Sequence, residues 1–119
     1  MLRNYMFYLE DIRESCEKII RFTQNVNFDE FVANEEKLYA IVHLLQIIGE
    51  AARSIPPAVR KTKPTLEWNE MIRLRNIVVH EYFHLDEKII WNVIKEKIPA
   101  ILGHIQSALS EGESDDRVQ

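Results

Sequence analysis

The segment from residue 35 to residue 54 restricts the fold most, because its apolar residues occupy two faces of a helix. Two rows recur at helical spacing along it: Leu38, Ile41, Leu45 and Ile48, and beside them Ala40, Leu44, Ile47 and Ala51. A helix that is apolar on two sides must be covered on both. We therefore expect this helix to lie at the centre of a helical bundle and to contribute to an interface.

The segments on either side also have helical patterns. Apolar residues at three- and four-residue spacing predict a helix over residues 2–26, and Asn27 and Asn34 are suited to cap a short turn over 28–33 and the central helix. Ile55 precedes two prolines and is pushed out of helical geometry, which ends the central helix near residue 54. Residues 57–65 then form a basic connector with room for one turn.

Two further helices are predicted in the C-terminal half. One begins near Trp68, and the other is capped by Asp86, runs to about Leu109 and is kinked by Pro99 one turn beyond Glu96. The prediction is an all-α, up-down bundle of four main helices plus short helical turns. Residues 1–110 form one domain, and residues 111–119 form an acidic tail that is expected to be disordered.

Composition bounds the class of protein. The chain has 119 residues, 46% of them hydrophobic and 29% charged, which is typical of one globular domain. Cys16 is its only cysteine, which excludes an internal disulfide and a multi-thiolate metal site. No apolar stretch suits a signal peptide or a membrane span, so a cytosolic protein without membrane contact is expected.

Charge is distributed unevenly along the chain. The formal net charge is −4, yet residues 52–75 contain six Lys or Arg and only two Asp or Glu. A basic strip of this kind suits a polyanion such as RNA. It is equally compatible with a solvated loop that happens to be basic, and both interpretations stay open.

Four polar side chains that suit a phosphodiester occur close together: Arg75, Asn76, His80 and Tyr82. The guanidinium of Arg75 would bind the phosphate, the imidazole of His80 titrates near neutral pH and would transfer a proton, and Asn76 would orient one of them. Each residue alone also has an ordinary structural explanation. Their combination is what predicts a site.

These side chains do not meet on one continuous helix. At about 100° per residue, Asn76 lies about 40° from His80, whereas Arg75 and Tyr82 lie about 140° and 160° from it. We therefore expect the helix to end near residues 80–81, so that Tyr82 turns back in the following loop. We also expect a second copy of the chain to bring a second set of these residues to the same cleft.

The same window fits the HExxH pattern of zinc hydrolases. Its residues would be His80, Glu81 and His84, completed by Glu96 or His104. Asp86 is suited to begin a new helix two residues after His84, so that the histidines lie where one helix ends. Ligands in that position are not held on one rigid face, and we treat zinc as the weaker alternative.

The residues around the motif resemble a known family. They are Trp68, the run from Leu74 to Phe83, Asp86, Trp91 and Ile98–Pro99, together with Ile48–Ala52 upstream. With these residues the chain resembles the HEPN superfamily and, within it, the HepT-like group, also called DUF86, over about residues 5–105.

This resemblance implies a homodimer and a concrete activity. HepT-like proteins are toxins of type VII-like prokaryotic toxin–antitoxin pairs. They act as metal-independent endoribonucleases, without a cofactor, through an Arg-x4-His-x-Tyr motif whose catalytic residues here would be Arg75 and His80. Their partner is an MntA-type nucleotidyltransferase antitoxin, which neutralises the toxin by transferring AMP to the motif tyrosine, here Tyr82. The substrate would be RNA, either tRNA or mRNA.

Two alternatives remain beside this one. A HEPN-like bundle also occurs as a non-catalytic nucleotide- or partner-binding companion of a nucleotidyltransferase. Glu50 is either a surface carboxylate or a supporting residue that orients Arg75 or His80 from the neighbouring helix. His43 and His104 are expected to have ordinary roles, His43 as a core or interface residue.

Overall fold

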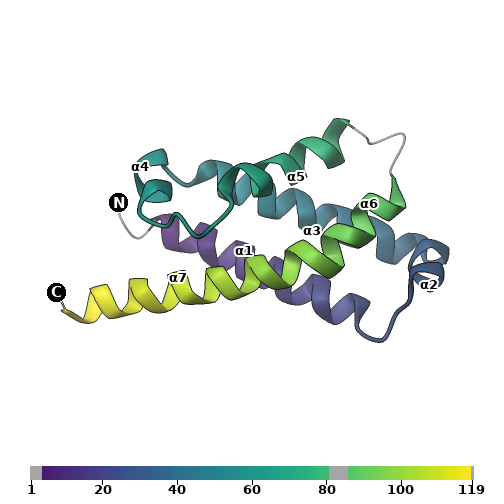
Figure 1. Ribbon diagram of the computed structural model, residues 1–119, viewed down its shortest axis with the longest axis horizontal. Helices are drawn as coiled ribbons and strands as arrows, with labels where there is room; N and C mark the ends of the chain where they lie inside the picture. Colours follow the sequence, from purple (N-terminus) through teal and green to yellow (C-terminus); the bar gives the residue numbers. More distant parts are fainter. Residues whose placement is uncertain (1–3, 81–85, 119) are drawn as a thin grey trace.

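The computed structural model is a bundle of helices (Figure 1). It describes the backbone of residues 4–80 and 86–118 and the side chains of residues 5–76 and 86–111. No strand occurs in these ranges, which confirms the prediction of an all-α fold. In chain order the elements are α1 (Asn4–Thr23), α2 (Phe28–Ala33), α3 (Glu35–Ser54), α4 (Pro57–Lys61), α5 (Trp68–His80), α6 (Glu87–Asn92), the π-helical turn η1 (Val93–Lys97) and α7 (Ile98–Val118).

The central position predicted for residues 35–54 is confirmed. The most extensive helix contacts of α3 are with α5 and with α1. Ile41, Leu45 and Ile48 are no more than 2% exposed, and Leu44 and Ala51 in the second row are also buried. Because α3 is apolar on two sides, each side takes a different neighbouring helix.

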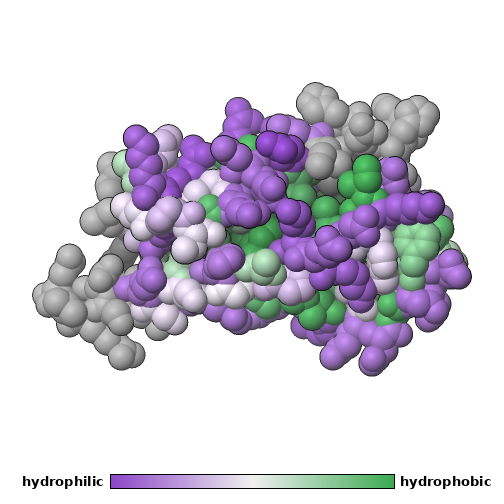
Figure 2. Space-filling view, viewed as in Figure 1, coloured by the Kyte–Doolittle hydropathy of each residue, from purple (hydrophilic) through white to green (hydrophobic). Residues whose placement is uncertain are grey.

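The remaining long helix, α7, completes the bundle against α1 and not against α5. The contacts of α1 with α7 are extensive, whereas α5 and α7 pack little against each other. On the face shown in Figure 2, patches of hydrophobic residues are visible among the hydrophilic ones. Among the helices that the structure describes, none is both long enough and apolar enough to cross a bilayer.

Helix caps fix the N-terminal half. The side chains of Asn27 and Asn34 each accept a hydrogen bond from a backbone N–H three residues ahead, as predicted. The first helix was predicted to reach residue 26, and α1 instead ends at Thr23. The physical reason is Asn25, whose φ of 59° is the left-handed conformation that asparagine tolerates and that ends helices.

The connector between α3 and α5 is held by its own hydrogen bonds. Ile55 has an extended backbone with ψ of 129°, as expected for a residue before proline. The basic connector contains one short helix, α4, in agreement with the single turn that the sequence allowed. The indole N–H of Trp68 donates to the carbonyl oxygens of Arg60 and Lys63, both at 3.1 Å. The start of α5 is therefore tied to the end of α4.

The C-terminal helix differs from its prediction in where it ends. Asp86 caps it as expected. Just before Pro99, where a kink was predicted, the helix contains the π-helical turn η1, in which the N–H of Ile98 donates to the carbonyl of Val93. The wider turn accommodates a proline that has no N–H to donate. The helix was predicted to end near Leu109, whereas α7 continues to Val118. No proline follows Pro99, and one glycine costs only about 1 kcal/mol. The disorder expected for residues 111–119 stays a prediction.

The short helix α2 holds α6 at one end of the bundle. The ring of Trp91 on α6 lies 5.2 Å from that of Phe31 and 6.0 Å from that of Phe28, centroid to centroid. Both separations are in the range of favourable aromatic pairs. This contact fixes where the chain re-enters the bundle before α7.

Asn34 serves two helices, and we expect its loss to destabilise the fold. Its side chain caps α3, and its backbone N–H donates to the carbonyl of Phe31 at the end of α2. Asn34→Ala should lower the free energy of unfolding by about 1 kcal/mol, measured by urea denaturation. Asn92→Ala is the matched control, because Asn92 is exposed and makes no side-chain cap. An equal effect of both variants would contradict the capping role.

Candidate active site

Three of the four motif residues lie on α5. The helix is continuous from Trp68 to His80, so Arg75 and His80 are about 140° apart around its axis. The predicted helix end near residues 80–81 can be followed only to His80. The side chain of His80 and the whole of Tyr82 lie outside the described residues. The structure therefore defines the guanidinium part of the site.

Arg75 is paired with a carboxylate of the central helix. Its Nε donates to Oε1 of Glu50. The side chain of Arg75 is 27% exposed and that of Glu50 is 49% exposed, so the pair lies at the surface. Glu50 is thus both exposed and in contact with Arg75, and its role in supporting the site stays a prediction.

The ion pair with Glu50 uses the Nε–H group of Arg75. Glu50 engages Nε, and in the part of the chain that the structure describes no hydrogen bond from Nη1 or Nη2 is found. A guanidinium binds a phosphate through two parallel N–H groups. Arg75 thus retains a pair of donors for a ligand. Because both partners are partly exposed, the ion pair contributes little to stability, and its main effect is on orientation.

Gly49, the residue before Glu50, allows α5 to approach α3 closely. A Cβ built on Gly49 would lie 2.4 Å from Cβ of Arg75 and 2.8 Å from its backbone nitrogen. These separations are much shorter than the 3.5–4.0 Å of ordinary carbon contacts. The sequence contains one indication of this role. Gly49 is an isolated glycine inside a strongly apolar helix, and a glycine there lowers the stability of the helix by about 1 kcal/mol relative to alanine, so it usually has a packing reason.

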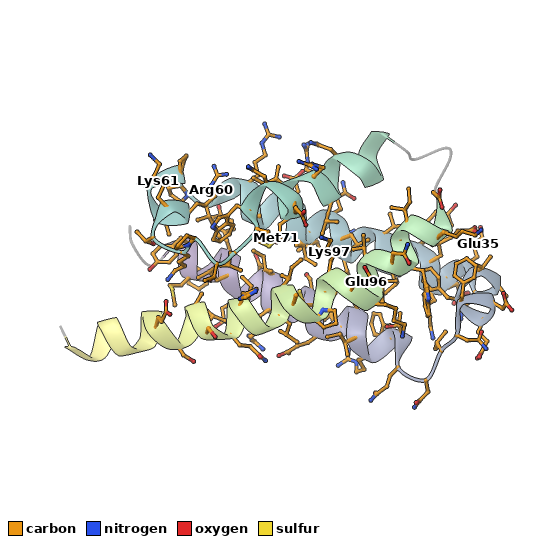
Figure 3. All side chains as sticks on the ribbon, in the orientation of Figure 1. Glu35, Arg60, Lys61, Met71, Glu96 and Lys97 are labelled. Carbon is orange, nitrogen blue, oxygen red and sulfur yellow. The ribbon has the colours of Figure 1, made fainter. Side chains whose placement is uncertain are left out.

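The basic strip over residues 52–75 is divided by the fold. Arg60 donates through Nε to the carbonyl of Ile55 at 3.1 Å, and the side chain of Lys63 is only 9% exposed, with Nζ 3.9 Å from Glu111. Figure 3 shows Arg60 at the α4 end of the molecule. The cations of the strip that are exposed are Arg53, Lys61 and Arg73. Of these, Arg73 is on the same helix as Arg75.

A cavity lies elsewhere in the part of the chain that the structure describes. This space of about 350 Å³ lies between α5 and the η1–α7 segment, its walls combine apolar side chains such as Leu74 and Ile101 with charged ones, and Arg75 does not line it. Lys97, labelled in Figure 3, reaches from η1 to Glu70 on α5 at 2.8 Å. Its ammonium lowers the pKa of the Glu70 carboxyl. Arg75 is partly exposed and lies outside this cavity.

The zinc alternative falls mostly outside the described residues. Glu81, His84 and the side chain of His80 are not described, and the suggested third ligands, Glu96 and His104, lie on η1 and α7. Among the side chains that the structure describes, no three His, Cys, Asp or Glu residues are grouped as metal ligands.

The other histidines are at the surface. His104 is exposed on α7. His43 was expected either in the core or at an interface. The core position is wrong, because the side chain of His43 is exposed on α3. It lies on the same side of α3 as Tyr39, which is 52% exposed. The interface expectation for His43 is taken up below.

Cys16 is not available as a nucleophile. Its side chain is fully buried between the helices, and burial raises the pKa of the thiol to about 12. A thiol becomes a nucleophile only as the thiolate. Covalent catalysis through Cys16 does not fit this structure.

Most of the chain, including this site, matches a known family. The sequence model of the family described as ribonuclease HepT-like aligns with residues 12–108. The chain belongs to this family. It is 37% identical over 106 residues to a probable ribonuclease HepT from Thermococcus cleftensis, covering 89% of this chain and 96% of that protein. It is 38% identical over 104 residues to a putative RNase from Methanocaldococcus jannaschii, covering 87% and 95%. No solved structure shows significant similarity to the chain.

We expect Cys16 to be unreactive in the folded protein. With a pKa of about 12, its thiol stays protonated even at pH 9, whereas unfolding returns the pKa to about 9. Reaction with Ellman's reagent should be slow in buffer and complete in guanidinium chloride. The contribution of Cys16 to stability should be complete below pH 9 and fall as the pH rises further, because only the unfolded thiol ionises there. Rapid labelling of the folded protein would contradict the buried position.

Proposed function

We propose that this chain is a metal-independent endoribonuclease and the toxin of a HepT/MntA-type toxin–antitoxin pair. The observation that carries the proposal is the surface arginine Arg75, oriented by Glu50 and five residues before His80 on the same helix, in a chain of the ribonuclease HepT-like family. The relatives named as ribonucleases support RNA as the substrate.

RNA supplies its own nucleophile, so the chain needs only a base, an acid and a charge clamp. The 2′-hydroxyl attacks the adjacent phosphorus, its proton passes to a base, and the leaving 5′-oxygen accepts a proton. The products end in a 2′,3′-cyclic phosphate and a 5′-hydroxyl. His80 is proposed to transfer these protons, and Arg75 to stabilise the added negative charge of the transition state through Nη1 and Nη2. Asn76 would hold the imidazole or the phosphate.

A second copy of the chain is proposed to complete the site. Positions 75 and 80 are about 140° apart around the axis of one helix, so a single copy of α5 does not present both positions on one face. The exposed side of α3 next to Glu50 contains Tyr39 and His43, with Ile47 partly buried beside them. Aromatic residues such as Tyr39 are enriched in interfaces relative to the rest of a protein surface. A two-fold dimer through this face would bring both sets of motif residues to one cleft.

Tyr82 is proposed as the point of control. An MntA-type nucleotidyltransferase would transfer AMP from ATP to its hydroxyl, releasing pyrophosphate. Each AMP adds a phosphodiester with a charge of about −1 and a bulky base. Both would compete with RNA for Arg75, by repulsion and by occupancy.

His80→Ala should remove ribonuclease activity without removing the fold. General acid–base catalysis contributes about 10²–10⁴-fold, so cleavage of total RNA or tRNA should fall at least about 10²-fold. The assay contains a chelator, follows cleavage on gels and identifies cyclic phosphate ends. Light scattering should still show the dimer.

His104→Ala is the matched control for this variant, because it removes an exposed histidine from α7. It should cleave RNA like the unaltered protein. Cleavage retained in His80→Ala, or activity that requires added zinc, would remove the proposed mechanism.

Tyr82→Phe should escape neutralisation. Without the phenolic oxygen there is no acceptor for AMP, so the variant should stay toxic when the nucleotidyltransferase is co-expressed. Mass spectrometry of the co-expressed unaltered protein should find the added AMP on the peptide that contains Tyr82. Modification at another tyrosine, for example the exposed Tyr39, would contradict this part of the proposal.

A further inference from the structure

Gly49 and Glu50 are consecutive residues of α3, and both meet Arg75. The first faces the Cβ and backbone of Arg75, and the second binds its side chain. We propose that Gly49 is a positioning residue: by admitting the backbone of α5 against α3, it brings the guanidinium to Glu50 and so sets the direction from which Arg75 meets a phosphate. This inference rests on the proposed ribonuclease function.

The contact leaves no room for any side chain at position 49. A Cβ there would lie 2.4 Å from Cβ, 2.8 Å from the backbone nitrogen and 3.0 Å from Cα of Arg75. None of these three atoms can swing aside as the end of a long side chain would. To restore ordinary contact distances, α5 would have to move away from α3 by about 1 Å.

Such a movement acts directly on the candidate site. Cα of Arg75 would be carried outward with α5, while Glu50 stays on α3, so the bond from Nε to Oε1 would be lengthened or broken. A misplacement of about 1 Å at a reacting group can reduce a rate by about 10²-fold. Gly49 would therefore affect catalysis through Arg75, without touching RNA itself.

The chain contains a matched control for a change from glycine to alanine. Gly103 lies in α7, and a Cβ built there meets no atom within 4 Å. Gly103→Ala makes the same chemical change in a helix without a steric consequence. It should behave like the unaltered protein in each assay below.

The first measurement is RNA binding without cleavage. The probe is a fluorescent single-stranded 2′-O-methyl oligoribonucleotide, which lacks the attacking hydroxyl, and its affinity is measured over a range of salt concentrations. In Gly49→Ala the slope of log K against log salt should fall by about 0.7, the value for one lost phosphate contact. The double variant Gly49→Ala/Arg75→Ala should bind no more weakly than Arg75→Ala alone, because the two positions act through the same group.

The second measurement is independent of RNA. The Nε–Hε signal of Arg75 in an NMR spectrum, assigned with Arg75→Lys, should report the hydrogen bond to Glu50. It should shift in Gly49→Ala and in Glu50→Ala, and stay in place in Gly103→Ala. The cleavage rate should fall by about 10²-fold in Gly49→Ala with a smaller change in KM.

Glu50 variants keep the inference testable if Gly49→Ala does not fold. Glu50 is half exposed, so its replacement should leave the packing intact. Glu50→Ala should lose cleavage, and Glu50→Gln, which keeps the accepting oxygen, should retain most of it. Cleavage by Glu50→Ala equal to that of the unaltered protein would overturn the inference, since orientation of Arg75 would then not matter.

Other outcomes separate this inference from the proposed function. A folded Gly49→Ala with unchanged signal, salt slope and cleavage rate would overturn it. So would a double variant much weaker than Arg75→Ala, because Gly49 would then act through other groups. If the unaltered protein did not bind the oligonucleotide but the signal moved as described, Gly49 would still position Arg75, and the ribonuclease function would be the part that fails.

Discussion

The close contact between α3 and α5 is the constraint on which the candidate site depends. It exists because Gly49 presents no side chain to the backbone at Arg75. Since α5 is one continuous helix to His80, the residues that follow Arg75 take their direction from this contact. The next residue of α3, Glu50, adds a charge at the same place. One turn of the central helix thus determines both the position of the α5 backbone at Arg75 and the orientation of the Arg75 guanidinium.

This arrangement separates stability from activity. The free energy of folding comes mainly from buried aliphatic side chains on α1, α3 and α7, of which Ile12, Ile48 and Ile105 are fully buried. The pair of Arg75 and Glu50 is partly exposed and adds little to that energy. A bundle of this kind keeps its fold when the polar groups on its surface change. The chemistry therefore depends on orientation, which a few contacts control.

The sequence predicted those features whose cause lies within a few residues. The caps at Asn27 and Asn34 and the end of α3 before Pro56 are local, and they are present. The early end of α1 depends on one backbone angle at Asn25, which its neighbours do not reveal. The contact of Gly49 with Arg75 joins residues that are 26 positions apart. Helical periodicity shows which faces are buried, but not which residues of two buried faces meet.

The π-helical turn η1 has a consequence for the phase of the last helix. A π turn holds about one more residue than an α turn, and this rotates everything after it by about 100° around the axis. Ile98, Ile101 and Ile105 face the core of the bundle with that rotation included. A homologue that lacks one residue in this turn could form a regular α-helix here and still direct its corresponding isoleucines to the same neighbours. The alignment of the two chains would then contain a one-residue gap at this turn.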